Sequence, residues 1–410
     1  MPSKYFNNYF IILFSLIPFS FLVGPAFSLL NVILIDISFL FFIIYQKDFI
    51  FLKNDTLKYF LIFYIYLIFN SVISIEPQAG ILRNLGFLRI VILFITFNYF
   101  LNDSTFTKRV LSIWLLTLLI VIFDVYLESI TGKNILGYGG KFGGAGGSRV
   151  VSFFKEEPIV GAYLFGFYLL IIGFLLNHFE NKYKLLIFIF SLFFLIAIII
   201  TGERSNGIKA LLGTILFLLF YKGFNSRVKI GIFVSFFLII FLIIFNSNFL
   251  KIRFLYQLKT YINTDNVYFS LYKSGYQVFK NNPIVGVGNK NYRIETCRGN
   301  IEKSTKNNNY ICQTHPHQIY FEILAEHGLV GLLVIFYLLY KLIFSKIRKS
   351  LKGNNYIQIG SLIYLLLIFL PVVPSGSFFG DFSLTLFLIN IGIFYGSSSK
   401  LNLFNYKNLS

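Results

Sequence analysis

The chain has 410 residues, of which 56% are hydrophobic, 20% are aromatic and only 13% are charged, and its mean hydropathy is +0.73. A soluble protein of this length has no core large enough to bury so many phenylalanine, isoleucine and leucine side chains. Repeated apolar runs of about 17–25 residues are typical of membrane-spanning helices. The composition therefore predicts an all-α polytopic membrane protein and excludes an ordinary soluble enzyme.

Basic residues outnumber acidic ones by 36 to 17, and the formal net charge is +19. In a soluble protein this excess would indicate nucleic-acid binding, but no basic module with interleaved aromatic residues accompanies it. Basic loops that set the membrane topology and contact anionic lipids explain the charge better. We therefore expect membrane lipids, and not nucleic acid, among the partners.

The hydropathy pattern predicts about twelve transmembrane helices, at residues 9–24, 27–45, 59–75, 84–101, 110–128, 158–177, 185–201, 208–221, 230–246, 328–344, 357–373 and 383–396. We expect the first to be a retained helix and not a signal peptide, because no small-residue cleavage site precedes Pro25. The chain then divides into four parts: five helices, four helices with a glycine-rich loop, one large late loop domain, and three helices with a tail, at residues 1–128, 129–246, 247–327 and 328–410.

Lysine and arginine concentrate in the short loops that share one side of the membrane when the N-terminus is cytoplasmic. Such a bias sets the orientation of helical membrane proteins. It places three polar segments on the outer face, at residues 129–157, 202–207 and 247–327. If the protein performs chemistry, we expect it on that face, because the spans themselves are nearly free of charge.

The first outer loop contains a glycine-rich run, residues 137–147, followed by Arg149 and by the pair Glu156–Glu157. The run lacks the Gly-Lys-Ser/Thr ending of a phosphate-binding loop, so we interpret it as a flexible loop. The two carboxylates open a predicted span. They either cap the helix against its dipole or belong to a site on the outer face.

The second outer loop is a short turn, Thr201 to Gly207, that contains Arg204. A guanidinium held at the membrane boundary offers a planar fork that suits phosphate oxygens. Alternatively, the neighbouring Glu203 pairs with it. Both interpretations stay open from position alone.

The late loop contains both cysteines of the chain, Cys297 and Cys312, which favours a disulfide on the outer face over a metal site. Residues 246–327 contain ten basic residues against five acidic ones. An anionic substrate at the outer surface would explain this excess, and so would a solvated basic loop.

The end of the late loop contains two histidines that are candidates for a general base. We expect Thr314 to cap a helix, which would place His315, Glu322 and Glu326 on one face and His317 on the opposite face. A histidine is the natural base near neutral pH, and a carboxylate on the same face would orient it. This helical pattern alone favours His315.

Four motifs in order resemble those of the O-antigen ligase and O-antigen polymerase superfamily. They are Phe154-x-x-Glu157-x-x-x-Gly161, Arg204 in its short turn, Asn282-Pro283 to Gly288, and the run His317-Gln318-x-Tyr320-Phe321-x-x-Leu324-Ala325-Glu326-x-Gly328-x-x-Gly331. The resemblance covers roughly residues 150–335. It ranks His317 above His315, because His317 matches the position of the family histidine.

The resemblance implies bundled membrane helices under a periplasmic loop domain in the bacterial inner membrane. It implies transfer of a glycan from undecaprenyl diphosphate to a sugar hydroxyl of lipid A-core or of another glycan, without a metal or other cofactor. Arginines would hold the diphosphate, and Arg204 matches the first of them. The absence of an Asp-x-Asp pair among the seven aspartates agrees with a metal-free reaction.

One departure concerns a second arginine that many members carry ahead of the Asn-Pro pair. The corresponding neighbourhood, residues 268–273, contains none, so we expect Lys273 or Arg293 to supply the charge, with Arg149 and Glu157 on the same face. A ligase and a polymerase share this chemistry and stay undistinguished. A transporter or flippase is the alternative from another class, but it would place charged groups near the bilayer midplane.

Overall fold

The computed structural model describes residues 4–139, 148–257, 267–301 and 310–405. The glycine-rich run, from residue 140 onward, and most of the polar stretch between the cysteines lie outside these ranges. The described part of the chain contains helices and no strand. The predicted all-α class is therefore correct.

Helices occupy every segment that the sequence marks as a span. The longer ones are α1 (Lys4–Val23), α2 (Pro25–Gln46), α3 (Asp55–Val72), α4 (Pro77–Leu85), α5 (Phe87–Phe100), α6 (Ser104–Thr131), α7 (Val160–His178), α8 (Lys184–Ile200), α9 (Arg204–Phe220), α10 (Ser226–Asn246), α13 (Val267–Asn281), α14 (Tyr292–Ile301), α15 (Ile319–Leu342), α17 (Tyr356–Ile368) and α18 (Asp381–Gly396). Short connecting helices are η1 (Ile50–Lys53), η2 (Ser152–Phe154), η3 (Asn181–Tyr183), α11 (Asn248–Lys251), the π-helical η4 (Ile252–Tyr256), η5 (Phe344–Lys346) and α16 (Ile347–Leu351).

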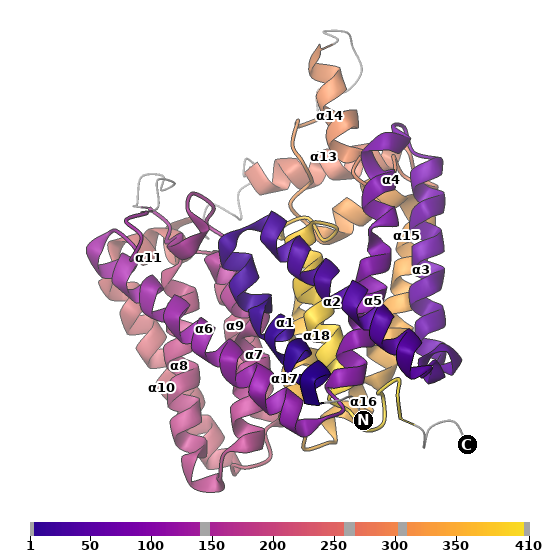
Figure 1. Ribbon diagram of the computed structural model, residues 1–410. Coiled ribbons are helices and arrows are strands. Elements are labelled where there is room, and N and C mark those ends of the chain that lie inside the picture. The colour runs from indigo at the N-terminus through magenta and orange to yellow at the C-terminus, as the bar shows by residue number, and fades with distance from the viewer. Residues whose placement is uncertain (1–3, 140–147, 258–266, 302–309, 406–410) are drawn as a thin grey trace.

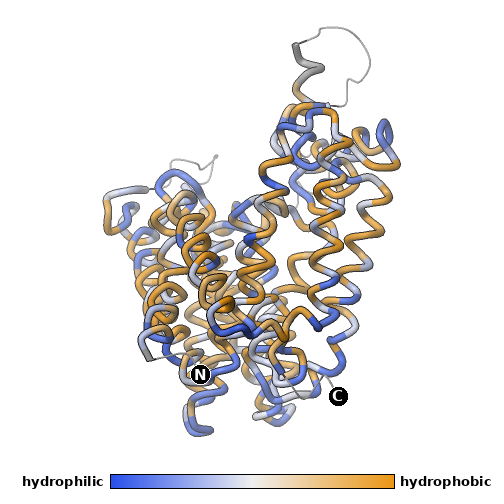
Figure 2. Tube along the Cα trace, turned by 45° about the vertical axis from the view of Figure 1, so that its right-hand side comes forward, coloured by the Kyte–Doolittle hydropathy of each residue, from blue (hydrophilic) through white to orange (hydrophobic). Residues whose placement is uncertain are grey.

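Eight helical segments in the described ranges are long and apolar enough to cross a membrane, and α17 and α18 are shorter apolar helices. The segment expected at 84–101 is longer than predicted: it begins at Pro77 and is interrupted at Gly86 between α4 and α5. Figure 2 shows hydrophobic residues along the helices and hydrophilic residues gathered at their ends. This distribution is that of a multi-pass membrane protein.

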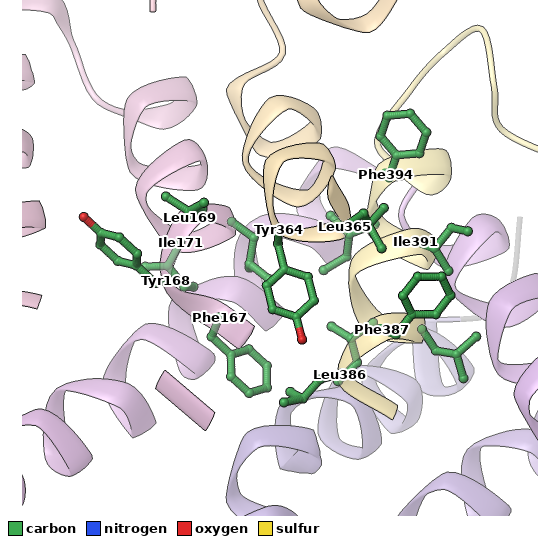
Figure 3. Close-up of a cluster of buried hydrophobic side chains, with 14 of the residues drawn as sticks. Phe167, Tyr168, Leu169, Ile171, Tyr364, Leu365, Leu386, Phe387, Ile391 and Phe394 are labelled. Atoms are coloured by element: carbon green, nitrogen blue, oxygen red, sulfur yellow. The ribbon is translucent and has the colours of Figure 1, made fainter. Parts of the chain in front are cut away.

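The centre of the bundle is α7, which is buried along most of its length and packs against α17 and α18. In Figure 3, Tyr364 of α17 lies between apolar side chains of α7 and of α18. Glycines allow the close approach of α7 to α17, since a Cβ on Gly173 would collide with the Tyr356 carbonyl and one on Gly360 with the Leu169 carbonyl. Small residues at helix crossings have this function in membrane bundles.

Both chain ends lie at one end of the bundle, and α11, α13 and α14 lie at the opposite end (Figure 1). A disulfide joins Cys297 of α14 to Cys312, fifteen residues later. Helix α13 packs on the beginning of α15, so the late loop is attached to the bundle through that helix.

Candidate functional site

The Asn282–Gly288 motif has a structural function that the sequence did not reveal. Helix α15 is broken at Gly328, which adopts φ 63°. The motif packs against this break: Val287 N–H donates to the Ala325 carbonyl at 2.9 Å, and Leu329 N–H donates to the Pro283 carbonyl at 2.9 Å. The motif thereby satisfies backbone groups on both sides of the break, which would otherwise lack helical partners.

Glycines make this contact possible. A Cβ on Gly286 would collide with the backbone between Glu326 and His327, and one on Gly328 would collide with the Ile284 carbonyl. Both glycines also have positive φ, which other residues adopt at a cost. The two motifs, far apart in sequence, are therefore two halves of one interlocked structure.

Asparagines fasten this structure to the N-terminal helices. Asn70 of α3 accepts a hydrogen bond from Asn289 N–H at 2.8 Å and donates to the Val285 carbonyl at 3.2 Å. Asn291 Oδ1 accepts from Glu76 N–H at 2.8 Å. These contacts fix the late loop relative to α3 and α4.

The beginning of α15 differs from the prediction. The N-cap is Gln318, whose Oε1 accepts from Tyr320 N–H at 2.7 Å and from Phe321 N–H at 3.1 Å, so Thr314 is not the cap. His315 precedes the helix and shares no helical face with Glu322 or Glu326. The prediction relied on Pro316, because proline is common in the first turn of a helix. In the structure the amide side chain of Gln318, four residues after Thr314, caps the helix instead.

The two histidines lie together in the irregular segment before α15, and their ring centroids are 4.2 Å apart. His317 adopts φ 54°, a left-handed conformation that is uncommon outside glycine. Its carbonyl accepts from Ser375 N–H at 2.9 Å, and its ring meets Tyr268 edge to face at 6.0 Å. These contacts orient His317 while leaving its imidazole on the wall of a cavity.

That cavity has a volume of about 670 Å³ and brings together three predicted site residues from distant parts of the chain: Arg149, Arg204 and His317. Arg253 and Lys209 also line it, together with Glu203. The described lining residues include four cations and only one carboxylate. Such an arrangement suits an anionic ligand and, above all, phosphate oxygens.

Arg204 is positioned by the turn that precedes it. It is the first residue of α9, and the turn is shorter than expected, residues 201–203. The buried Glu203 carboxylate accepts hydrogen bonds from Gly161 N–H, from Ala162 N–H at 3.1 Å and from Asn206 Nδ2 at 2.7 Å. Glu203 therefore caps the beginning of α7 and ties it to the turn. Burial raises the pKa of Glu203 to about 7, although its hydrogen bonds oppose the shift.

Arg253 is the cavity arginine that the sequence analysis did not select. It lies in the π-helical η4, and its guanidinium donates to the Gly202 carbonyl through Nε at 3.1 Å and through Nη2 at 3.0 Å. π-Helical turns are common at functional sites. The position lies 15 to 20 residues before the expected place of the second arginine, residues 268–273, so the linear motif could not reveal it.

Arg149 reaches the cavity from the segment between α6 and α7. The buried Glu128 of α6 accepts from Ser152 N–H at 2.7 Å and from Val151 N–H at 3.1 Å, and Asp124 accepts from Ile135 N–H at 2.8 Å. The two carboxylates hold both ends of the loop that carries Arg149 against α6.

Both histidines are neutral at pH 7. Burial, reinforced by the neighbouring His315, lowers the pKa of His317 to about 4. Burial and the nearby Lys290 ammonium lower the pKa of His315 to about 4 as well. A neutral imidazole can accept a proton from a hydroxyl, as the predicted role requires.

Other predicted site residues lie elsewhere. Lys273 and Arg293 are exposed and are not among the described residues that line the cavity, and Glu157 lines a neighbouring cavity. Glu322 is buried and accepts from Phe378 N–H at 2.8 Å, while Glu326 accepts from Tyr292 N–H at 3.3 Å. The two glutamates thus hold loops in place and are not among the described residues that line the cavity.

Lys290 joins one of these loops to α15. Its ammonium donates to the Ser377 hydroxyl at 2.9 Å, and that hydroxyl donates to the Glu322 carboxylate at 2.5 Å. Ser375, two residues away, binds the His317 carbonyl. Lys290 therefore supports the histidine segment indirectly. The described residues contain no group of three or more metal-binding side chains.

Comparison with known proteins finds a similarity in the central part of the chain. A search of curated proteins finds no match. The family model described as O-antigen ligase matches residues 188–336, a range that includes Arg204, Arg253, His317 and the interlocked motifs. This match confirms that the chain resembles the O-antigen ligase and O-antigen polymerase superfamily, whose members are associated with glycan transfer.

Proposed function

We propose that this protein transfers a glycan from undecaprenyl diphosphate to an acceptor sugar hydroxyl, without a metal or other cofactor. The observation that carries the proposal is the single cavity that Arg149, Arg204, Arg253 and His317 all line. Cations and a proton acceptor within one cavity meet the two requirements of glycosyl transfer from a diphosphate.

In the proposed reaction, the acceptor hydroxyl attacks the anomeric carbon of the donor glycan. The bond between that carbon and the diphosphate oxygen breaks, and its electron pair leaves with the diphosphate. The arginines stabilise the charge that develops on this leaving group. The hydroxyl proton passes to His317, and the diphosphate anion, lying in the same cavity, raises the pKa of that histidine toward neutrality.

We propose further that the chain crosses the bacterial inner membrane about twelve times, with the cavity on the periplasmic face. The distribution of lysine and arginine in the loops supports this orientation. It agrees with the arrangement in Figure 1, where both termini lie at the end opposite to α11, α13 and α14. The glycan donor would then enter the cavity from the outer leaflet.

A ligase and a polymerase differ only in the acceptor, lipid A-core for the first and a second lipid-linked glycan for the second. Deletion of the gene followed by lipopolysaccharide electrophoresis separates the two. Loss of attached polymer with accumulation of long lipid-linked glycan indicates a ligase, and lipopolysaccharide with one repeat unit indicates a polymerase. An unchanged profile of every surface glycan would contradict the proposed function. Complementation with Arg204→Ala should fail at normal membrane levels.

A transporter is the second candidate, and the charge distribution argues against it. Three of the four cations of the cavity, Arg149, Arg204 and Arg253, come from helix ends and connecting segments, and the fourth, Lys209, lies in the second turn of α9. A transport pathway would instead need polar groups near the middle of the spans.

A further inference from the structure

Lys209 is a buried lysine to which neither the family motifs nor the proposed reaction assigns a role. It lies in the second turn of α9, is 5% exposed and lines the same cavity as Arg204. Its ammonium makes no hydrogen bond and no ion pair within the described part of the chain. A lysine is almost never buried in this way without a partner, because an unpaired buried charge costs free energy. A ligand of the cavity is therefore the expected partner of this ammonium.

The carboxylate on the cavity wall does not serve as that partner. Among the described lining residues only Glu203 is acidic. Its oxygens accept from Gly161 N–H, from Ala162 N–H and from Asn206 Nδ2, so they are used in capping α7 and in holding the turn before α9. Lys209 therefore contributes a positive charge that no acidic side chain on the described cavity wall neutralises.

Lys209 lies deeper in the bundle than Arg204. Arg204 begins α9, and the five residue steps from it to Lys209 correspond to about 7.5 Å along the helix axis. The wall at this depth is aromatic and aliphatic, with Phe165 of α7, Tyr364 of α17 and Leu386 of α18; Figure 3 shows the last two. Side chains of an α-helix tilt toward its N-terminus, so the lysine stem rises from its backbone position toward Arg204.

This depth matches the order of groups in the proposed donor. A lipid diphosphate has one phosphate next to the sugar and a second one next to the lipid chain. Because the lipid chain lies in the bilayer, the second phosphate lies closer to the membrane interior than the first. The arginines at the helix ends are placed for the sugar-side phosphate, and Lys209 is placed for the lipid-side phosphate. A lysine suits this position, since a single point charge on a long apolar stem reaches one phosphate past apolar surroundings.

We propose that Lys209 binds the lipid-side phosphate of the donor and thereby selects a lipid diphosphate over a lipid monophosphate. With a diphosphate bound, the arginines and the lysine each have a phosphate partner. A monophosphate occupies the arginines alone and leaves the lysine ammonium buried and unpaired, which disfavours its binding. The inference rests on the proposed function and adds the residue that determines its specificity for the donor.

Binding of two short prenyl phosphates to the purified full-length protein tests this selection. The probes are geranylgeranyl diphosphate and geranylgeranyl monophosphate, and the Kd of each is measured for the unmodified protein and for each variant. Lys209→Met removes the charge and keeps the length of the side chain, whereas Lys209→Arg keeps the charge. Lys280→Met replaces an exposed lysine of α13 and is the matched control. Arg204→Ala removes a cation that both ligands use.

We expect the unmodified protein and Lys280→Met to bind the diphosphate at least about tenfold more tightly than the monophosphate, in the range of one hydrogen bond to a charged group. Lys209→Met should reduce this ratio to less than about threefold and leave the Kd of the monophosphate within about twofold. Lys209→Arg should keep most of the preference, and Arg204→Ala should weaken the binding of both ligands.

The thermal unfolding midpoint of the ligand-free protein separates this role from a structural one. Lys209→Met exchanges an unpaired buried ammonium for an apolar side chain, so the midpoint should rise. A lower midpoint with equal weakening of both ligands would show that Lys209 stabilises the fold, and this result would overturn the inference. An unchanged ratio of the two Kd values in Lys209→Met, or an unmodified protein without preference, would overturn it as well.

The proposed function has a separate readout. Glycan transfer from the diphosphate donor by the unmodified protein, together with an unchanged ratio in Lys209→Met, would remove the role of Lys209 and leave the proposed function intact. Binding of neither prenyl phosphate to the unmodified protein would contradict both.

Discussion

Single residues decide the chemistry of the cavity, and His317 decides its pH dependence. Its pKa of about 4 lies below the ordinary value, so the imidazole of the free protein stays neutral as the pH falls from 7 to about 5. We expect kcat/KM for the donor to stay nearly constant over this range and to fall near pH 4. kcat should also fall as the pH is lowered, but with a midpoint at higher pH than that of kcat/KM, because the bound diphosphate raises the pKa of His317.

The measurement is the initial rate of glycan transfer by purified protein between pH 3.5 and 8. A midpoint of kcat/KM near 6.5 would contradict the assignment. His315→Ala serves as the matched control. It removes the neighbour that helps to lower the pKa of His317, so activity should persist with its midpoint at higher pH. Full activity in His317→Ala together with loss in His315→Ala would reverse the roles of the two histidines.

The sequence indicated individual site residues better than it indicated which residues meet in the folded site. Arg204 and His317 are recognisable because each stands at a fixed place in a short motif, and the structure puts both on one cavity. Arg253 was missed because it reaches the site through a π-helical turn that no linear pattern marks. Lys273 and Arg293 were chosen for proximity in sequence, whereas their positions on α13 and α14 leave them exposed.

At the scale of elements, the break in α15 holds the late loop in place. A side chain at Gly328 would adopt an unfavourable φ and would also collide with the Ile284 carbonyl. We expect Gly328→Ala to lower the free energy of unfolding by about 2–4 kcal/mol, since strain and steric overlap add. Activity should fall with it, because the histidine segment is attached to the same helix.

Thermal unfolding of the purified variants in detergent measures this effect. Gly231→Ala in α10 is the matched control, because a Cβ there meets no atom within 4 Å. Alanine in an exposed helical position should raise the midpoint slightly. Equal midpoints for the two variants would show that the break in α15 does not depend on glycine.

The disulfide constrains a second element, the segment between α14 and α15. Replacing Cys297 and Cys312 together by serine should cost about 3 kcal/mol in the chain-entropy model, because the bridge closes a fifteen-residue loop. The loss should appear as faster proteolysis of this segment, with the membrane helices intact. Reduction of the unmodified protein should reproduce it. Equal proteolysis rates before and after reduction would show that the bridge stabilises little.

At the scale of the whole molecule, hydropathy was sufficient to predict an all-helical membrane protein. A long apolar segment that crosses lipid must satisfy its own backbone hydrogen bonds, and a helix does so within one segment. Helix ends were less predictable. Gly86 divides one expected span, and Gln318 replaces Thr314 as the cap of α15. Where a helix begins and ends depends on local contacts that hydropathy does not record. The interlocking of residues 283–288 with the break in α15 is a tertiary feature that no single segment reveals.

The central claim is that one cavity holds a lipid diphosphate and delivers its glycan to a hydroxyl. Transfer from undecaprenyl-diphosphate-linked glycan to rough lipopolysaccharide, measured with purified full-length protein, tests it most directly. We expect Arg204→Ala, Arg253→Ala and His317→Ala each to lower the rate at least about 100-fold, in the range found when one stabilising donor of a transition state is lost. The exposed Arg293→Ala should stay within twofold. Undiminished transfer by Arg204→Ala and His317→Ala, or an equal loss in Arg293→Ala, would contradict the account.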